Sequence, residues 1–164
     1  MVKYKEDTVS VVFNEIPDYV SLAIEITNCP GHCVGCHSPW LREDIGEPLT
    51  PLKLFELIEQ NKGINCVVFM GEGKDPIALK LLASAIMLQY PNLKIALYSG
   101  REEVEKEYDN FFDFIKVGPY IPEKKALNYE TTNQRLYEIE RSFGPDGEIM
   151  TTRKDITYKF WKKD

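Results

Sequence analysis

Three closely spaced cysteines constrain the fold of this chain more than any other feature of its sequence. Cys29, Cys33 and Cys36 form a CxxxCxxC pattern directly after an apolar, alternating segment that is typical of a β-strand. Gly31 and Gly35 allow the tight backbone turns that bring three sulfur atoms together. Disulfide bonds across such short separations are geometrically awkward. The spacing therefore favours a metal site in a loop that follows a strand.

Two kinds of metal site fit this spacing. Three thiolates can each bind one iron of a four-iron cluster, which leaves the fourth iron open to another ligand. In the alternative, a structural zinc ion takes the three thiolates together with His32 or His37, and the chain is a binding module without catalysis. The position of the loop directly after a strand favours the cluster. Cys66 stands apart in an apolar run and is predicted to be a small buried hydrophobic residue.

The hydrophobic pattern alternates between strand-like and helix-like segments. Short runs rich in apolar and β-branched residues predict strands over 9–13, 20–27, 64–70, 93–100 and 114–118. Helices are predicted between Thr50 and Gly63, from Asp75 to before Pro91, and over 101–112. From about residue 119 the alternation fades, and PDG at 145–147 predicts a turn between extended segments.

Alternating strands and helices indicate an α/β fold with a mostly parallel sheet. A complete eight-stranded barrel typically needs about 250 residues, more than the 164 of this chain. We therefore expect one domain over residues 1–164, with an open sheet or a partial barrel. Ligands collect at the carboxyl ends of parallel strands. The cysteine loop, GEGKD at 71–75 and YSG at 98–100 all follow strands, so we expect them to line one cleft.

The charge of the chain disfavours two classes of partner. With a formal net charge of -6 and no lysine-rich or arginine-rich run, it has no basic field for nucleic acid or an anionic membrane. The N-terminal segment lacks the pattern of a signal peptide, and no apolar stretch reaches the length that spans a bilayer. We expect a cytoplasmic protein that binds neither nucleic acid nor membranes.

The cysteine pattern resembles that of the radical S-adenosylmethionine (SAM) superfamily, and further segments resemble the activating proteins of anaerobic ribonucleoside-triphosphate reductases. CHSPWL at 36–41 is similar to the segment after the third cysteine of these activators. VGPYI at 117–121 resembles their DGPF-type segment, with Val117 in place of the acid, and TTNQR at 131–135 resembles a C-terminal Ser-x-Asn-Gln-Arg signature. The resemblance covers most of the chain and implies a partial, open (β/α) barrel of the radical SAM type.

By this resemblance, Cys29, Cys33 and Cys36 bind a [4Fe-4S] cluster whose remaining iron is chelated by SAM. The reduced cluster passes an electron to the sulfonium, which releases methionine and a 5'-deoxyadenosyl radical that abstracts hydrogen. In the activator branch, the hydrogen comes from a backbone glycine of the partner, an anaerobic ribonucleotide reductase, and a glycyl radical remains there. The chain has no second cysteine cluster, so a flavodoxin or a ferredoxin is expected to supply the electron.

The resemblance also implies two segments that contact SAM. The Gly-Gly-Glu/Asp-Pro motif of the family stands here as residues 70–73, with Met70 in place of the first glycine. The end of the next strand lies where relatives contact the ribose or the carboxylate of the cofactor. The expected cofactor-binding residues are Met70, Gly71, Glu72, Gly73, Ser99 and Gly100.

Two questions stay open at this point. A radical SAM enzyme of this kind acts either on the reductase or, alternatively, on another glycyl radical enzyme or a small molecule. Asn133, Gln134 and Arg135 either close the site, dock the partner or simply lie on the surface.

Overall fold

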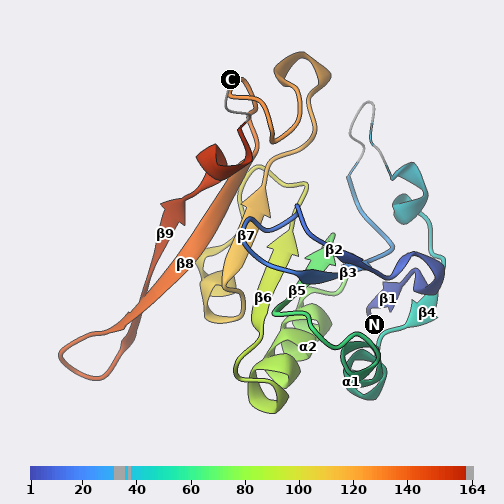
Figure 1. Ribbon diagram of the computed structural model, residues 1–164, viewed down its shortest axis with the longest axis horizontal. Helices are drawn as coiled ribbons and strands as arrows, with labels where there is room; N and C mark the ends of the chain where they lie inside the picture. Colours follow the sequence, from blue (N-terminus) through green and yellow to red (C-terminus); the bar gives the residue numbers. More distant parts are fainter. Residues whose placement is uncertain (32–35, 37, 162–164) are drawn as a thin grey trace.

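The computed structural model describes residues 1–31, 36 and 38–161 of the chain (Figure 1). Its strands are β1 (Lys3–Tyr4), β2 (Ser10–Val12), β3 (Ser21–Glu25), β4 (Glu47–Pro48), β5 (Cys66–Met70), β6 (Lys94–Tyr98), β7 (Phe114–Val117), β8 (Arg135–Phe143) and β9 (Ile149–Asp155). Its α-helices are α1 (Pro51–Gln60) and α2 (Pro76–Gln89). Short 3-10 helices include η2 (Pro39–Arg42), η3 (Lys106–Asn110) and η5 (Thr157–Phe160).

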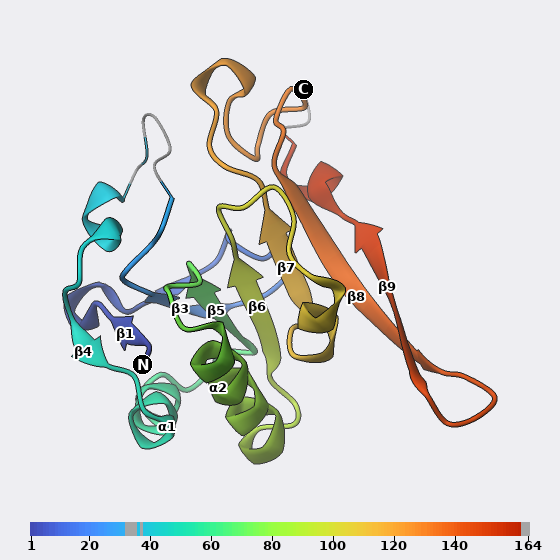
Figure 2. The ribbon, with the colours of Figure 1, turned by 180° about the vertical axis from the view of Figure 1, so that it is seen from behind.

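A seven-stranded central sheet combines a parallel middle with antiparallel margins. Its strand order is β2-β3-β5-β6-β7-β8-β9. The neighbours β3, β5, β6 and β7 run parallel, whereas β2 pairs antiparallel with β3, and β8 and β9 continue antiparallel beyond β7. β1 and β4 form a separate two-stranded sheet. The carboxyl ends of the parallel strands share one edge, and the loops after β3, β5 and β6 start there (Figure 2).

Both α-helices begin where the sequence predicts them. Thr50 precedes α1 and its side chain accepts a hydrogen bond from the Lys53 amide at 3.1 Å. Asp75 caps α2 in the same way by accepting from the Ala78 amide at 3.1 Å. Each cap satisfies an amide that the first helical turn leaves without a partner, and a proline follows at the first helical position. Neither helix of the described part of the chain is long and apolar enough to cross a membrane.

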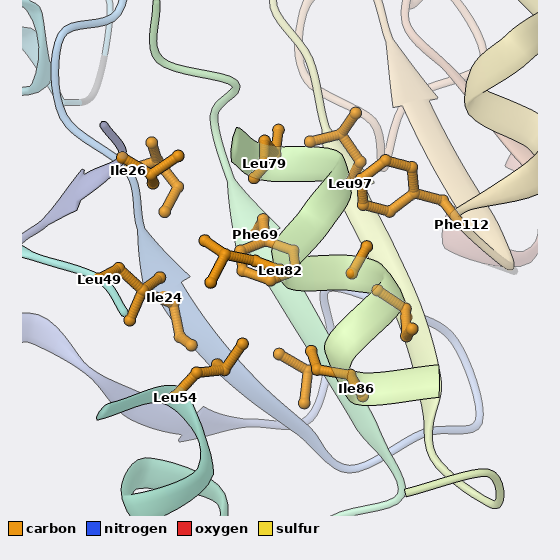
Figure 3. Close-up of a cluster of buried hydrophobic side chains, with 14 of the residues drawn as sticks. Ile24, Ile26, Leu49, Leu54, Phe69, Leu79, Leu82, Ile86, Leu97 and Phe112 are labelled. Carbon is orange, nitrogen blue, oxygen red and sulfur yellow. The ribbon is translucent and has the colours of Figure 1, made fainter. Parts of the chain in front are cut away.

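The two α-helices cover the same face of the sheet and bury the main core against it. Figure 3 shows Ile24, Phe69 and Leu97, from three neighbouring strands, facing Leu82 and Ile86 of α2. The opposite face carries a smaller apolar cluster beneath residues 13–20 and the C-terminal segment. The thinner cover leaves the carboxyl end of this second face accessible, and the candidate site lies there.

The prediction of a partial (β/α) barrel with a mostly parallel sheet is wrong. Only three of the six strand pairings of the central sheet are parallel. In the described residues, α-helices connect only β3 to β5 and β5 to β6, whereas a barrel of this type places a helix after every strand. The chain instead forms an open mixed sheet, because β8 turns back antiparallel along β7.

The helix predicted over 101–112 is also wrong, since this segment contains only the short helix η3. Glu103 and Glu107 would repel each other one turn apart in an α-helix. Tertiary contacts then decide the conformation, because the Asp109 carboxylate accepts a hydrogen bond from Arg153 at 2.8 Å and the Asp109 carbonyl accepts one from Arg141 at 2.9 Å.

The turn predicted at 145–147 is confirmed. It joins β8 and β9 into a hairpin of residues 135–155, which we call the C-terminal arm. Gly147 has φ +76°, a conformation that suits glycine, and the Gly144 amide donates to the Glu148 carbonyl at 2.7 Å. The turn of the arm projects away from the helices and from the rest of the sheet (Figure 1).

Candidate functional site

The loop that carries the cysteines is closed at its base by backbone hydrogen bonds. The Cys29 amide donates to the Leu41 carbonyl at 2.7 Å, and the Asn28 amide donates to the Glu43 carbonyl at 3.2 Å. Asn28 has φ +65°, which asparagine tolerates better than most residues. The two ends of the loop therefore lie side by side, directly beyond the carboxyl end of β3.

The described thiols of this loop are available for a metal. Cys29 and Cys36 are free and partly exposed. The Ser38 amide donates to the Cys36 sulfur at 3.4 Å, and an amide aimed at sulfur stabilises the thiolate that binds a metal. Thiolates are soft ligands that suit iron–sulfur clusters and zinc, so the donor set fits the cluster chemically.

Cys33, His32 and His37 lie outside the described residues. Within the described part of the chain, no three His, Cys, Asp or Glu side chains gather closely enough to hold a metal.

Cys66 is confirmed as a buried hydrophobic residue. It lies in β5 with no exposed surface, on the face of the smaller apolar cluster. Burial raises the pKa of its thiol to about 12, which keeps it protonated and unreactive at neutral pH.

The glycine turn after β5 packs directly on the segment that leads into the cysteines. Gly71 and Gly73 have φ +111° and +68°. A Cβ at Gly73 would meet both the Ile26 side chain and the Thr27 carbonyl at 3.1 Å, so a larger residue would push the two segments apart. The Gly71 amide donates to the Tyr98 carbonyl at 2.9 Å. The carboxyl ends of β3, β5 and β6 are thus brought together, as the sequence predicts.

Glu72, in the same turn, is held by a partly buried hydrogen-bond network. Its carboxylate accepts two hydrogen bonds from Arg101, at 3.0 and 2.8 Å, and a third from the Ser99 hydroxyl. The Glu72 side chain is only 12% exposed. Arg101 also reaches Glu105 at 3.0 Å and lies over the ring of Tyr108. This network fastens the turn after β5 to the segment after β6.

The balance of forces on Glu72 favours its charged form. Burial acts to raise the pKa of Glu72, but hydrogen bonds from Arg101 and Ser99 outweigh it, and the pKa lies below the usual value for glutamate. The carboxylate is therefore committed to Arg101 and Ser99. The Gly71 amide is engaged with Tyr98, so the groups of this turn left for a ligand are the Gly71 carbonyl and the backbone groups of Glu72 and Gly73.

A row of polar and polarisable side chains crosses the open face of the sheet at the carboxyl end. The register places Glu25 beside Met70, Met70 beside Tyr98, and Tyr98 beside Lys116. The Trp40 ring nitrogen, from the far end of the cysteine loop, lies 3.5 Å from the Glu25 carboxylate. The cysteine loop therefore reaches the same face of the sheet as this row.

A cavity of about 680 Å³ lies against this row, within the size range of small-molecule sites. Met70, Tyr98 and Lys116 form its floor. The Tyr98 hydroxyl donates to the Glu15 carbonyl, and burial raises the pKa of Tyr98. The buried Lys116 side-chain nitrogen donates to the Gly118 carbonyl at 3.0 Å and lies 5.5 Å from the centre of the Tyr98 ring.

The segments 117–121 and 131–135 meet at the rim of this cavity. The Asn133 amide group donates to the Pro119 carbonyl at 3.0 Å, and the Gln134 amide group donates to the Gly118 carbonyl at 3.3 Å. Gly118 has φ +106°, and a Cβ there would lie 3.0 Å from the Gln134 Cα. Gln134 lines the cavity, whereas Arg135 pairs with Asp155 at 3.5 Å.

The expected cofactor-binding residues thus fall into three groups. Met70 faces the cavity, and Gly71 and Gly73 touch the entry to the cysteine loop. Glu72 and Ser99 are engaged with each other, and Ser99 is buried. Gly100 is exposed and has no neighbour within 4 Å of an added Cβ, so nothing there requires glycine.

Sequence reasoning missed Lys116 and Glu15, which line the cavity with Tyr98. Strand alternation could have identified Lys116, because a lysine within the apolar strand FIKV marks a polar position at a carboxyl end. Nothing in the sequence places residues 13–18 over the cavity.

Comparison of the chain with protein-family models, with curated proteins and with solved structures finds no match. The function of the chain must therefore be inferred from the site itself. That site combines a thiol-bearing loop, a glycine turn with accessible backbone groups and an adjoining cavity with aromatic and cationic walls.

Proposed function

We propose that this chain is an activating enzyme that holds a [4Fe-4S] cluster through Cys29, Cys33 and Cys36 and uses SAM to generate a glycyl radical on an anaerobic ribonucleotide reductase. One observation carries the proposal: the segment that enters the cysteine loop packs on the glycine turn at 71–73. In the family that the sequence resembles, these two segments bind the cluster and the methionine end of the cofactor. Their contact here supports the same division of roles on an open sheet.

The residues of the chain prepare this site in three ways. Cys29 and Cys36 present partly exposed thiols, and the Ser38 amide stabilises negative charge on the Cys36 sulfur. Gly71 and Gly73 let the backbone approach a ligand without a side chain in between. Arg101 holds Glu72 and so fixes the turn that carries both glycines. When bound, the reduced cluster supplies the electron that breaks a carbon–sulfur bond of SAM.

The open face of the sheet suits a protein substrate. The cavity adjoins Met70, directly beside the glycine turn, so a ligand that spans the turn extends into it. The rim formed by 117–121 and 131–135 leaves room for a glycine-bearing loop of a partner, whose surface completes the exclusion of water. The remaining cysteine, Cys66, is buried, so the electron comes from an external donor such as a flavodoxin or a ferredoxin.

Anaerobic reconstitution with iron and sulfide tests the proposal. After reduction with dithionite, the protein should convert SAM to 5'-deoxyadenosine, measured by chromatography. Cys29→Ala, Cys33→Ala and Cys36→Ala should each abolish iron retention and product, because each removes one thiolate ligand. Cys66→Ala is the matched control and should retain both, since that thiol is buried in β5.

Electron paramagnetic resonance of a mixture with the cognate reductase tests the partner. A doublet glycyl signal that requires SAM and disappears with Cys33→Ala is expected. Colourless protein that retains zinc after reconstitution would overturn the enzymatic proposal. Deoxyadenosine without a glycyl radical would instead favour a small-molecule substrate, for which the cavity of about 680 Å³ has room.

A further inference from the structure

The outer edge of the C-terminal arm is a free sheet edge. β9 is the last strand of the central sheet, and no other strand among the described residues pairs with its outer side. Strand β9 contains no proline and therefore keeps every backbone donor. Free edges of this kind readily pair with another strand.

The arm carries exposed apolar side chains near its turn. Phe143 is 81% exposed, Ile149 61% and Met150 55%. Such a group at the tip of a projecting hairpin is unusual for a surface that faces only water. The arm therefore offers both backbone hydrogen bonds and apolar area to a partner.

Two arginines hold the arm in a fixed position. Arg141 donates to the Asp113 carboxylate at 2.7 Å and to the Asp109 and Phe112 carbonyls at 2.9 Å. Arg153 donates to the buried Asp109 carboxylate at 2.8 Å. A partner strand that adds to this edge therefore loses little freedom of the arm on binding.

Hydrogen bonding within the hairpin determines which backbone groups of β9 point toward the free edge. The Glu148 carbonyl accepts from Gly144, and the Ile156 amide donates to Leu136, so both residues face β8. Backbone groups alternate sides along an antiparallel strand. The amides and carbonyls of the odd-numbered residues, 149, 151, 153 and 155, consequently point away from β8.

The charges along this edge are self-complementary about Thr151. Glu148 and Lys154 stand three residues to either side of it, and both are exposed. In the described part of the chain, neither side chain makes an ion pair of its own. A twofold antiparallel pairing centred on Thr151 puts each Glu148 directly opposite Lys154 of the other copy, on the same face of the sheet.

From this edge we infer that two copies of the chain associate through antiparallel pairing of their β9 strands, centred on Thr151. An isologous dimer needs a surface that complements itself, and this register provides it twice. The odd-numbered residues Ile149 and Arg153 then exchange backbone hydrogen bonds across the interface. Opposite charges directly across an antiparallel pair are stabilising.

Neighbouring registers lose the pairing of Glu148 with Lys154. Centring on Thr152 places Glu148 opposite the apolar Ile156, and centring on Arg153 brings two Arg153 side chains face to face. The dimer is independent of the proposed radical chemistry, because the arm contributes none of the cysteines or the glycine turn.

Sedimentation of the full chain tests the dimer, under anaerobic, reducing conditions so that disulfides form no cross-link. Between about 1 and about 200 µM, the range of weak to moderate interfaces, the wild type should pass from monomer to dimer. Glu148→Lys and Lys154→Glu should each weaken the dimer by about tenfold or more, because like charges then face each other. The double variant with both changes should restore association.

Glu140→Lys provides the matched control. It makes the same charge change on the same arm, but Glu140 lies on β8, away from the free edge, so dimerisation should be unchanged. Circular dichroism verifies that each variant is folded. A wild type that stays monomeric overturns the inference, as does a dimer that single charge reversals leave intact. Binding of the reductase that Glu148→Lys weakens, with no self-association, would assign the edge to the reductase and overturn the inference as well.

Discussion

The two faces of the central sheet are built from the same strands but serve different purposes. Among the described residues, the face beneath α1 and α2 contributes to a core of 23 buried side chains, whereas the opposite face contributes to a cluster of eight. The first face carries most of the apolar burial that stabilises the fold. The second face ends in the polar row of Glu25, Met70, Tyr98 and Lys116, beside the cavity.

Strand alternation produces this difference one residue at a time. In β5, Phe69 points to the helices and Met70 to the cavity, and in β6 Leu97 and Tyr98 divide in the same way. Within one strand, one residue therefore contributes to stability and the next residue contributes to the site. Substitutions at neighbouring positions should separate the two.

Phe69→Ala should have the largest effect on stability. Phe69 is fully buried and makes an edge-to-face contact with Phe112 at 6.4 Å between ring centroids. Its loss should lower the free energy of unfolding by about 3 to 5 kcal/mol, measured by urea denaturation. Met70→Ala, one residue away, should cost only about 1 kcal/mol, because that side chain already borders a cavity.

For SAM binding, we expect the opposite order: Met70→Ala should have the larger effect and Phe69→Ala the smaller. Met70→Ala should change the dissociation constant of SAM in the reconstituted protein, since the side chain lies beside the glycine turn. Folded Phe69→Ala should bind SAM as the wild type does. Equal losses of stability in the two variants would show that the faces are not divided in function.

The sequence predicts the parallel middle of the sheet well and its margins poorly. The runs around Val67, Leu97 and Ile115 are apolar because their strands are covered on both faces, and such runs are visible without a structure. β8 and β9 carry exposed and charged residues along most of their length, so no alternation reveals their pairing. The barrel expectation failed here, since nothing local indicates that β8 returns antiparallel to β7.

The candidate site shows the same limit. The cysteine spacing and the glycines at 71 and 73 signal a site because they report local backbone geometry. The commitment of Glu72 to Arg101, 29 residues away, depends on the crossover through α2 and leaves no local trace. Glu72 is expected at the cofactor, and its carboxylate also joins two loops through Arg101 and Ser99.

Arg101→Gln should have an intermediate effect on stability. It leaves the Glu72 carboxylate buried with only the Ser99 hydroxyl as a strong partner. Because Arg101 itself is 41% exposed, solvent reduces the cost to about 2 kcal/mol. Glu105→Gln is the matched control: it removes the other carboxylate partner of Arg101 but is itself exposed, so the stability should change little.

The effect of Arg101→Gln should depend on pH. The pKa of Glu72 is lowered in the folded chain. The contribution of its charged carboxylate to folding stability is therefore complete above the ordinary glutamate pKa of about 4.3. It is lost as pH falls through the lowered pKa of the folded state. Denaturation of the metal-free protein should therefore show a full difference between wild type and Arg101→Gln at pH 7 and a shrinking one below about pH 4. A difference that grows on acidification would contradict this account of Glu72.

Gly73→Ala should have a small effect on stability and a specific effect on the site. Gly73 has φ +68°, which costs about 1 kcal/mol in any other residue, and its added Cβ would press on Ile26 and Thr27 at 3.1 Å. Gly147→Ala isolates the first contribution, because Gly147 has φ +76° but no atom within 4 Å of an added Cβ. Both variants should lose about 1 kcal/mol of stability from backbone strain, and Gly73→Ala should lose somewhat more because Ile26 and Thr27 are displaced.

Only Gly73→Ala moves the turn relative to the entry of the cysteine loop, so only this variant should weaken SAM binding in the reconstituted protein. If Gly147→Ala weakened SAM binding equally, the contact between turn and loop would not be what positions the cofactor.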